Sequence, residues 1–252
     1  MDPNENDDSQ NHQLDPGLLE YVTVYSREPN TNSNGSAKID VSSVNLSPNG
    51  QLGALLRTTF GQARATQILT ALGSQPGGPG GGGGGPPGRF SSPLRFFIRS
   101  RMTSSEFSQI ATNITATSGT MVEGRVNVNS ASVAVLTCLT GGDAGAAQTL
   151  VNYRQLNPNN LASIAWVVDA LGQNSPDALN ALAAGDFLTT QSYQCAADIA
   201  ALGPHGRGYR RVRLILDTSS GTPQIVYRQD LTHLGWALGK EVRQTWLLAK
   251  GT

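Results

Sequence analysis

The chain has 252 residues, and its 18 Lys and Arg residues are balanced by 18 Asp and Glu residues, so its formal charge is zero. This balance argues against a dominant nucleic-acid-binding role, which is usually accompanied by an excess of basic residues. Only 38% of the residues are hydrophobic and 29 are Gly, which indicates that part of the chain lies outside any packed core, and no apolar run is long enough to span a membrane.

The N-terminal part of the chain is polar. Residues 1–17 are predicted to be a disordered acidic tail, and they lack the basic and apolar regions of a signal peptide. Residues 18–37 form a lead-in segment, with an extended stretch at 21–25 and loop composition over 28–37.

Two short extended motifs resemble each other and are each followed by a helical pattern. The first motif is KIDVSS at residues 38–43, and the second is RVNVNS at residues 125–130. Each reads as a basic residue, a β-branched residue, Asp or Asn, Val, and small polar residues that can cap a helix. We predict that 39–41 and 126–128 lie close together and pair, because such short strands cannot satisfy their backbone groups alone.

The segment after the first motif has helical spacing of apolar residues from Leu52 to Leu72, with a break expected near Gly61. Residues 73–88 are a Gly/Pro linker insertion that needs no fixed structure. A short helix is predicted after Pro93, followed by a capping box at residues 103–106 that opens another helix.

The segment after the second motif is also predicted to be helical. Ser130 or Ser132 is expected to cap a helix over 133–139, and Gly141-Gly142 makes a tight turn. The further helices are expected over residues 144–153, 161–171 and 176–184. Residues 38–190 therefore read as one helical domain that contains two helix-hairpin-helix-like units.

Residues 191–239 change to the alternating period of strands. Three strands, near 193–201, 210–216 and 225–228, are separated by short turns and predict an antiparallel β-meander. Residues 240–252 form a C-terminal tail. The segment from Leu231 onward carries Trp236 and Trp246, and its first residues could cover one face of the sheet.

The turn at Gly141, Gly142 and Asp143 is the first candidate binding feature. A helix-hairpin-helix that binds DNA holds a phosphate on its turn amides and on a helix N-terminus. Asp143 would repel a phosphate and use those amides itself, and no Lys or Arg flanks Leu139-Thr140. We therefore favour a structural hairpin, and the corresponding turn near Arg57 and Arg64 is weaker still as a phosphate site.

The second candidate binding feature is a pair of arginines. Strand alternation places Arg211 and Arg213 on one face of the meander, where they could serve a solvated face, protect an edge, or bind an acidic partner. No catalytic motif accompanies the polar residues of this region, so no enzymatic activity is expected.

The cysteines and histidines give no sign of a cofactor. The spacing of the three histidines, His12, His205 and His233, does not predict a metal site, and no cofactor is expected. Cys138 and Cys195 are expected to be small buried thiols.

Taken in order, these segments resemble one family. The segment YVTVYSREPN (21–30), the two motifs, the Arg-rich strand and VYR…LGW (226–236) look like the periplasmic part of a K-type minor pseudopilin of type II secretion, general secretion pathway protein K. The resemblance covers about 20–239, with the Gly/Pro insertion unmatched.

The resemblance implies an α+β fold in which a pilin-like antiparallel β-meander is joined to a large helical domain. It implies a structural role at the tip of a periplasmic pseudopilus, assembled with the I- and J-type minor pseudopilins on the periplasmic side of the inner membrane. The family's hydrophobic N-terminal helix and cleavage site are absent, so we expect a fragment, a trimmed form or an unanchored relative. Some members bind calcium in the sheet region, but no dense acidic loop here supports that.

A second function stays open at this point. A nucleic-acid-binding module of the competence-protein type shares the same hairpin motif. Neutral charge and Asp143 argue against it.

Overall fold

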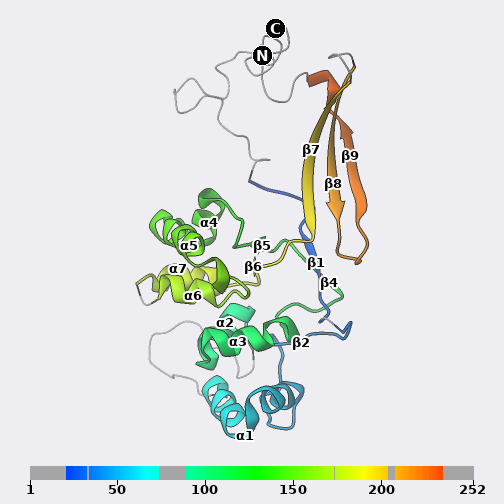
Figure 1. The fold of residues 1–252 in the computed structure, drawn as a ribbon. Helices are drawn as coiled ribbons and strands as arrows, with labels where there is room; N and C mark the ends of the chain where they lie inside the picture. Colours follow the sequence, from blue (N-terminus) through cyan, green and yellow to red (C-terminus); the bar gives the residue numbers. More distant parts are fainter. Residues whose placement is uncertain (1–20, 33, 74–88, 173, 204–207, 235–252) are drawn as a thin grey trace. The chain divides into compact units, whose positions relative to one another are not determined.

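The computed structural model describes residues 21–32, 34–73, 89–172, 174–203 and 208–234 (Figure 1). Helices, short strands and an antiparallel sheet occur together, which confirms the α+β class, and the chain divides into two compact units, residues 1–191 and 192–252. The predicted acidic tail, the Gly/Pro insertion at 74–88, His205 and the C-terminal region from residue 235 lie outside the described residues.

The first helical unit, residues 38–117, contains α1 (Gln51–Gly73), α2 (Pro93–Ser100), α3 (Ser104–Ile110) and the 3-10 turn η2 (Ala111–Asn113). The predicted break in α1 is present, because Gly61 has φ 80° and ψ 167° inside an otherwise helical run. A residue with a side chain is strained at this positive φ, so glycine permits the bend between the two halves.

The starts of α2 and α3 follow from their capping residues. The Ser92 hydroxyl accepts a hydrogen bond from the Arg95 amide at 3.0 Å, with Pro93 in the first turn. Thr103 and Glu106 form the predicted capping box, in which each side chain accepts from the other residue's backbone amide.

The second helical unit, residues 125–191, contains α4 (Val133–Leu139), α5 (Ala144–Leu156), the 3-10 turn η3 (Pro158–Asn160), α6 (Trp166–Leu171) and α7 (Pro176–Ala183). Ser132, one of the two predicted caps, accepts from the Val135 amide. The helix expected over 161–171 begins only at Trp166.

Each helical unit is closed by its own pair of two-residue parallel strands. Strand β2 (Ile39–Asp40) pairs with β3 (Ile114–Thr115), and β5 (Val126–Asn127) pairs with β6 (Leu188–Thr189). The prediction that the two motifs pair with each other is therefore wrong. Parallel strands need a long crossover, and here the helices of each unit provide it.

The two closures use the same hydrogen bonds. The amides of Val41 and Val128 donate to the carbonyls of Thr115 and Thr189, at 2.7 and 3.0 Å. In each motif the Asp40 or Asn127 side chain accepts from the amide two residues later, at 2.8 and 2.9 Å. The hydroxyls of Thr115 and Thr189 also accept from the amide two residues later.

One further ladder lies where loops were predicted. Strand β1 (Arg27–Pro29) pairs antiparallel with β4 (Met121–Glu123), and Glu28 and Pro29 of β1 fall in the segment 28–37 that had loop composition. The extended stretch predicted at 21–25 is not a strand. Propensity could not locate β1 because a three-residue strand is defined by its partner rather than by its own residues.

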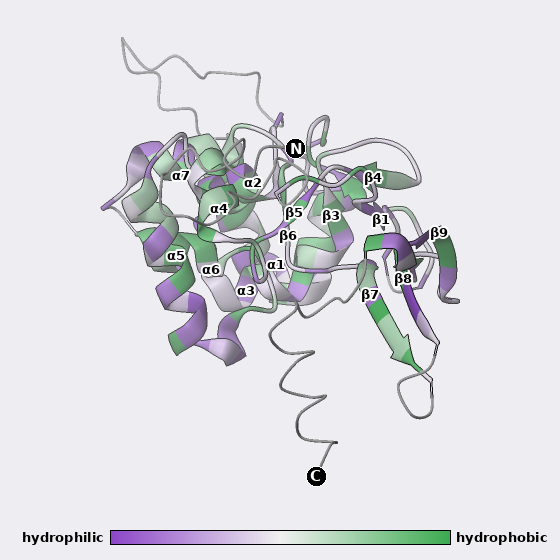
Figure 2. Cartoon of the chain, turned by 90° about the horizontal axis from the view of Figure 1, so that it is seen from above, coloured by the Kyte–Doolittle hydropathy of each residue, from purple (hydrophilic) through white to green (hydrophobic). Residues whose placement is uncertain are grey.

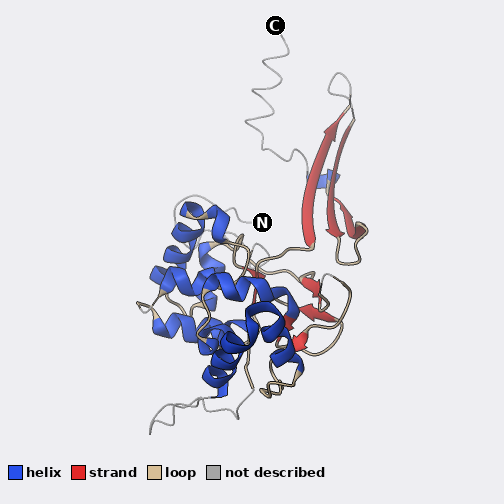
Figure 3. Ribbon diagram, turned by 60° about the horizontal axis from the view of Figure 1, so that its bottom comes forward, coloured by secondary structure: helices blue, strands red, loops and turns tan. Residues whose placement is uncertain are grey.

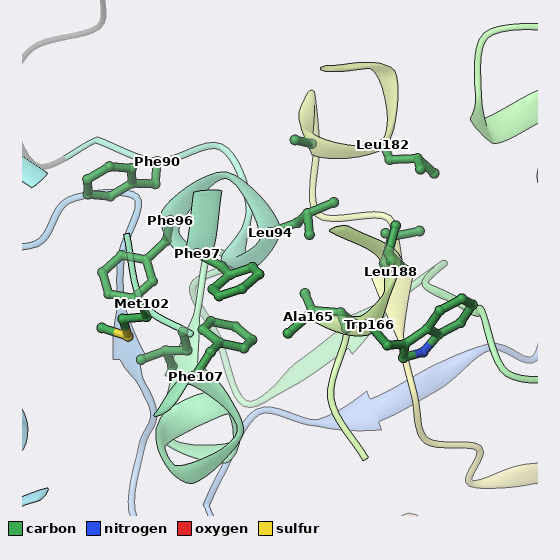
Figure 4. Packing of buried hydrophobic residues seen from close by; sticks show 14 of the residues in the cluster. Phe90, Leu94, Phe96, Phe97, Met102, Phe107, Ala165, Trp166, Leu182 and Leu188 are labelled. Atoms are coloured by element: carbon green, nitrogen blue, oxygen red, sulfur yellow. The ribbon is translucent and has the colours of Figure 1, made fainter. Parts of the chain in front are cut away.

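A single hydrophobic core runs through both helical units. Figure 4 shows aromatic side chains of α2 and α3 together with Ala165, Trp166, Leu182 and Leu188 of the second unit. Phe97 and Phe107 pack with ring centroids 4.7 Å apart. The helices gather in one body (Figure 3), because each is apolar on the side that faces this shared core.

Residues 192–234 form the predicted antiparallel meander. Its strands are β7 (Gln194–Leu202), β8 (Tyr209–Asp217) and β9 (Gln224–Asp230), in the order β7-β8-β9, followed by the 3-10 turn η5 (Thr232–Leu234). An irregularity between Ile215 and Leu216 shifts the register of β9, where Ile215 pairs with Tyr227 and Leu216 with Ile225.

Candidate functional site

The predicted turn between α4 and α5 is a tight Gly-Gly turn. Gly141 and Gly142 have φ values of 76° and 95°, which a residue with a side chain rarely adopts. Asp143 follows as the N-cap of α5, and its Oδ1 accepts a hydrogen bond from the Ala146 amide at 2.9 Å. The carboxylate thus takes a helix amide that an anion would otherwise use.

Other backbone groups of this turn are also satisfied within the hairpin. The Gly142 amide donates to the Thr137 carbonyl at 2.8 Å, and the Thr140 hydroxyl contacts the Asp143 carbonyl at 2.9 Å. A phosphate at this turn would have to displace Asp143 from α5 and would meet its negative charge.

The arginines nearest the two hairpins are mostly engaged inside the fold. Arg64 forms two hydrogen bonds with the Glu106 carboxylate, at 2.7 and 2.9 Å, and lowers the pKa of Glu106 to about 2. Arg154 donates to the Val128 carbonyl at 2.9 Å, and burial lowers its pKa. Arg57 makes one long contact with Asn49, at 3.5 Å.

The two predicted meander arginines differ in their contacts. Both lie on one face of the sheet, as predicted, since Arg211 pairs with Ala200 and Arg213 with Asp198. Arg211 holds the Asp198 carboxylate through two hydrogen bonds, at 2.9 and 2.6 Å, which lowers the pKa of Asp198. Arg213 is exposed and forms no ion pair with a described residue, so it is the better placed of the two to meet a partner.

A buried charge cluster is the most distinctive polar feature of the helical body. Arg125 precedes β5, Glu28 lies in β1, and Asp186 precedes β6. The Arg125 guanidinium forms ion pairs with both carboxylates, and the Arg125 and Glu28 side chains are only 7% and 9% exposed.

Residues from the other strands complete the cluster. The Thr189 hydroxyl of β6 donates to Glu28 Oε2 at 2.7 Å, and the Thr117 hydroxyl, two residues after β3, donates to Asp186 Oδ2 at 2.8 Å. Because these residues lie within or next to all three ladders, the cluster connects the places where both helical units close.

The charges of Glu28, Asp186 and Arg125 also affect the pKa of Lys38. Burial lowers the pKa of Lys38; Glu28 and Asp186 oppose this lowering, whereas Arg125 adds to it. Lys38 and Arg125 are the first residues of the two similar motifs, so the charge of each motif's basic residue interacts with Glu28 and Asp186.

Some polar atoms near this cluster have no partner among the described residues. They are Asp186 Oδ1, Arg125 Nε and Asn30 Oδ1, and all three are buried. Asn30 is held by its amide group, which donates to the carbonyls of Thr117 and Gly119 at 2.8 Å each.

The cluster was not predicted from the sequence. The shared basic residue at the start of each motif was the available signal, since a charged side chain that becomes buried needs a partner. Its partners could not be identified, because Glu28 and Asp186 are 97 and 61 residues from Arg125 along the chain.

The predicted burial of the cysteines is wrong, since both Cys138 and Cys195 are exposed free thiols. Within the described part of the chain, no three His, Cys, Asp or Glu side chains are grouped so that they could hold a metal ion. Over the same residues, no helix combines the length and apolar character needed to cross a membrane.

Comparisons with known proteins returned no relative. No family model matches this chain. No curated protein and no solved structure matches it either.

Proposed function

We propose that this chain is a structural and assembly subunit of a type II secretion pseudopilus, the K-type minor pseudopilin. In this role it lies at the pseudopilus tip on the periplasmic side of the inner membrane. It assembles with the I- and J-type minor pseudopilins, performs no catalysis and requires no cofactor.

The observation that carries the proposal is the equivalence of the two helical closures. Each unit begins with a basic, β-branched, Asp or Asn, Val motif and ends in a strand that pairs with it in parallel. The same three kinds of hydrogen bond recur in both closures. We infer that the units are duplicated helix-hairpin-helix-like modules, which is the arrangement expected from the resemblance.

The order of the elements adds support. The paired helical units are followed directly by the three-stranded antiparallel meander, which we assign as the pilin-like sheet of the family. Two similar helical units followed by a meander are the order that the resemblance implies, and this order supports the proposal.

The contacts of the polar residues favour protein partners over DNA. Asp143 caps α5, Arg64 and Arg154 are engaged within the fold, and the chain has no net charge to attract phosphates. The charge cluster joins the closures of the two units, and such a body can present a surface to other subunits without rearranging.

A binding experiment with purified components tests the proposal directly. The purified chain is mixed with periplasmic domains of I- and J-type pseudopilins from the same source, and complexes are measured by size-exclusion chromatography with light scattering. We expect a ternary complex, with an unrelated globular domain as control. Absence of any complex at concentrations up to about 100 μM would contradict the proposal.

The Gly-Gly hairpin is the observation that keeps a competence-type DNA-binding module as a second candidate. Under our proposal, duplex DNA binds no tighter than the ordinary non-specific range of ~10⁻⁴–10⁻⁶ M at physiological salt. Replacing Asp143 by Gly should not create tight binding, since one contact cannot supply the others. Submicromolar affinity that falls with salt and with loss of Arg57 or Arg154 would favour the second candidate.

A further inference from the structure

The three-stranded meander has two outer edges, and they differ in how well they are protected. The strand order β7-β8-β9 leaves one side of β7 and one side of β9 without a neighbouring strand among the described residues (Figure 1). An edge strand presents backbone N–H and C=O groups that can pair with a strand of another chain. Proteins usually protect such edges with charged side chains, proline, bulges or a short strand.

The β9 edge carries several of these protections. The strand has seven residues, Pro223 directly precedes it, and an irregularity interrupts its pairing with β8. The Leu231 amide donates to the Arg211 carbonyl, which fixes the alternation of this ladder. Alternation then directs the backbone groups of Arg228 and Asp230 away from β8, so two charged residues occupy the outer side of β9.

The β7 edge is longer and more regular. The strand has nine residues and pairs with β8 in one continuous register. At one end of this ladder the Thr218 amide donates to the Tyr193 carbonyl at 2.8 Å, and at the other end the Gly203 amide donates to the Gly208 carbonyl at 2.8 Å. The odd-numbered residues of β7 therefore bond to β8, and the even-numbered residues direct their N–H and C=O groups outward.

The outward positions of β7 are small and nearly uncharged. Ala196 and Ala200 are exposed, and Ile199 beside them is 52% exposed. Figure 2 shows the hydrophobic colouring along this strand. Asp198 is the single charged residue of β7, and the Arg211 guanidinium already holds its carboxylate, at 2.9 and 2.6 Å. The β7 edge therefore lacks the protections that β9 has.

Two copies of β7 related by a two-fold axis overlap most when the axis passes near residue 197, 198 or 199. The register centred on Asp198 places two carboxylates directly opposite each other, which is destabilising. The register centred on Ala197 places Asp198 opposite Ala196 of the second copy, whose neighbour on β8 is the apolar Ile215. Charge therefore disfavours both of these registers.

The register centred on Ile199 joins opposite charges. It places Asp198 opposite Ala200 of the second copy, and Ala200 pairs with Arg211 within its own chain. Because the alanine side chain is short, Arg211 of each copy then faces the Asp198 carboxylate of the other across it. On the other side of the sheet, Ile199 meets Ile199 of the second copy, and such aliphatic pairs stabilise adjacent strands.

We infer that this chain forms a two-fold dimer in which the two β7 strands pair antiparallel around Ile199. The two meanders then form one six-stranded sheet, and the occupant of the β7 edge is a second copy of the chain. The contact is isologous, and the outer edges that remain are the protected β9 edges, so assembly stops at the dimer. This inference goes beyond the proposed function and does not rest on it.

Analytical ultracentrifugation of the full chain, from micromolar to submillimolar concentration, tests the dimer. A contact between two strands is a small interface, so we expect reversible association of micromolar or weaker affinity. Ala200→Pro removes an outward N–H of β7 and spares the ladder with β8, since proline is tolerated where an edge N–H faces solvent. Its dissociation constant should rise on the order of tenfold, because each dimer loses two intermolecular hydrogen bonds.

Arg228→Pro is the matched control, because it removes an outward N–H from the other edge strand. It should leave the dissociation constant unchanged, and circular dichroism shows whether both variants keep their sheet. A wild-type chain that stays monomeric at every concentration would overturn the proposal. Equal weakening by the two proline variants would overturn it as well.

A pair of charge variants keeps the test valid if proline unfolds the sheet. Ala200→Asp places a carboxylate opposite Asp198 of the second copy and should raise the dissociation constant about three- to tenfold, because like charges directly opposite each other repel. Ala201→Asp adds the same charge to the other side of the same strand, opposite Ala197, and should have a much smaller effect. Equal weakening by both variants would contradict the register.

Disulfide trapping tests the register by distance, in a background that carries Cys138→Ser and Cys195→Ser. The two Ile199 residues form a non-hydrogen-bonded pair with Cα atoms about 4.5 Å apart, within the range of about 4.4–6.8 Å that a disulfide requires. The two Ala200 residues are about 8 Å apart, so Ala200→Cys is the control for Ile199→Cys. Oxidised glutathione takes up the two electrons and two protons that the thiols release, and becomes two reduced glutathione molecules.

We expect a covalent dimer of the Ile199→Cys variant and little of the Ala200→Cys variant. Similar yields for the two variants, or no covalent dimer for either, would overturn the proposal. A wild-type chain that is monomeric alone, but loses its complex with I- and J-type domains on Ala200→Pro, would assign the β7 edge to those partners and overturn the dimer. Failure of the chain to bind those domains, with the dimer intact, would count against the proposed function alone.

Discussion

The two helical units of this protein close in the same way but differ inside. Their motifs donate matching backbone hydrogen bonds to Thr115 and Thr189. In the first unit two helical stretches meet directly at the non-helical residue Gly61, whereas in the second α4 and α5 are separated by a longer turn that contains Gly141 and Gly142. The comparison teaches that the closure is the constant part and the hairpin is the part that varies.

The two motifs also differ in the side chains that contact the rest of each unit. Asn129 of the second unit donates to the Leu161 carbonyl and accepts from the Trp166 indole, both at 3.0 Å. Ser42, at the same place in the first motif, has no amide group to do this. Arg125 binds two carboxylates at once, which the single ammonium of Lys38 does not match.

The largest expected effect concerns Arg125. Arg125→Ala should reduce the free energy of unfolding by about 3–5 kcal/mol, because Glu28 and Asp186 are left as buried charges without a partner. Urea unfolding followed by far-UV circular dichroism measures this. Lys38→Ala, at the equivalent position of the first motif, should cost clearly less.

A surface control separates this effect from a general loss of charge. Arg210 pairs with Asp230, and their side chains are 76% and 56% exposed, so Arg210→Ala should change stability by less than about 1 kcal/mol. A similarly small cost for Arg125→Ala would show that the buried cluster is not what joins the two closures.

The next largest effect tests whether the two motifs occupy equivalent environments. Val41 and Val128 are both fully buried, so Val41→Ala and Val128→Ala should each cost about 1–3 kcal/mol and agree to within about 1 kcal/mol. Val24→Ala is the control, because Val24 is 92% exposed. Costs that differ by more than this between the two buried positions would argue against equivalent environments.

A smaller effect is expected at the hairpin turn of the second unit. Asp143→Ala removes the N-cap of α5 and should cost about 1 kcal/mol, whereas Asp143→Asn retains a capping oxygen and should cost less. Thermal unfolding of the two variants provides the measurement. Identical melting temperatures for wild type and Asp143→Ala would mean that the cap does not contribute.

The smallest effect depends on pH and belongs to the first unit. Arg64 lowers the pKa of Glu106 from 4.5 to about 2, so this pair contributes stability above about pH 4.5 and loses it as the pH falls toward 2. Because both side chains are partly exposed, the contribution should be below about 1 kcal/mol. Glu106→Gln should therefore reduce stability at pH 7 and leave it nearly unchanged at pH 2, as measured by urea unfolding at both values.

Much of the local structure could be predicted from the sequence. The glycine at position 61 predicted the bend in α1, and the capping box predicted the start of α3. The alternation of apolar and polar residues predicted the meander strands and the common face of Arg211 and Arg213. These features depend on residues close together in the chain, so spacing and residue type were sufficient. The same reasoning predicted that Asp143 would use the amides at the start of α5.

Only the tertiary structure decided which distant segments meet. The two motifs looked alike and were expected to pair, but each pairs with a strand more than 60 residues later, because two-residue strands carry no pairing information of their own. The partners of Arg125 and the exposure of Cys138 and Cys195 were decided in the same way. The sequence by itself determined most of the helices, their caps and the faces of the meander strands, whereas the short ladders and the contacts between residues far apart in the chain depended on how the shared core packs the helices together.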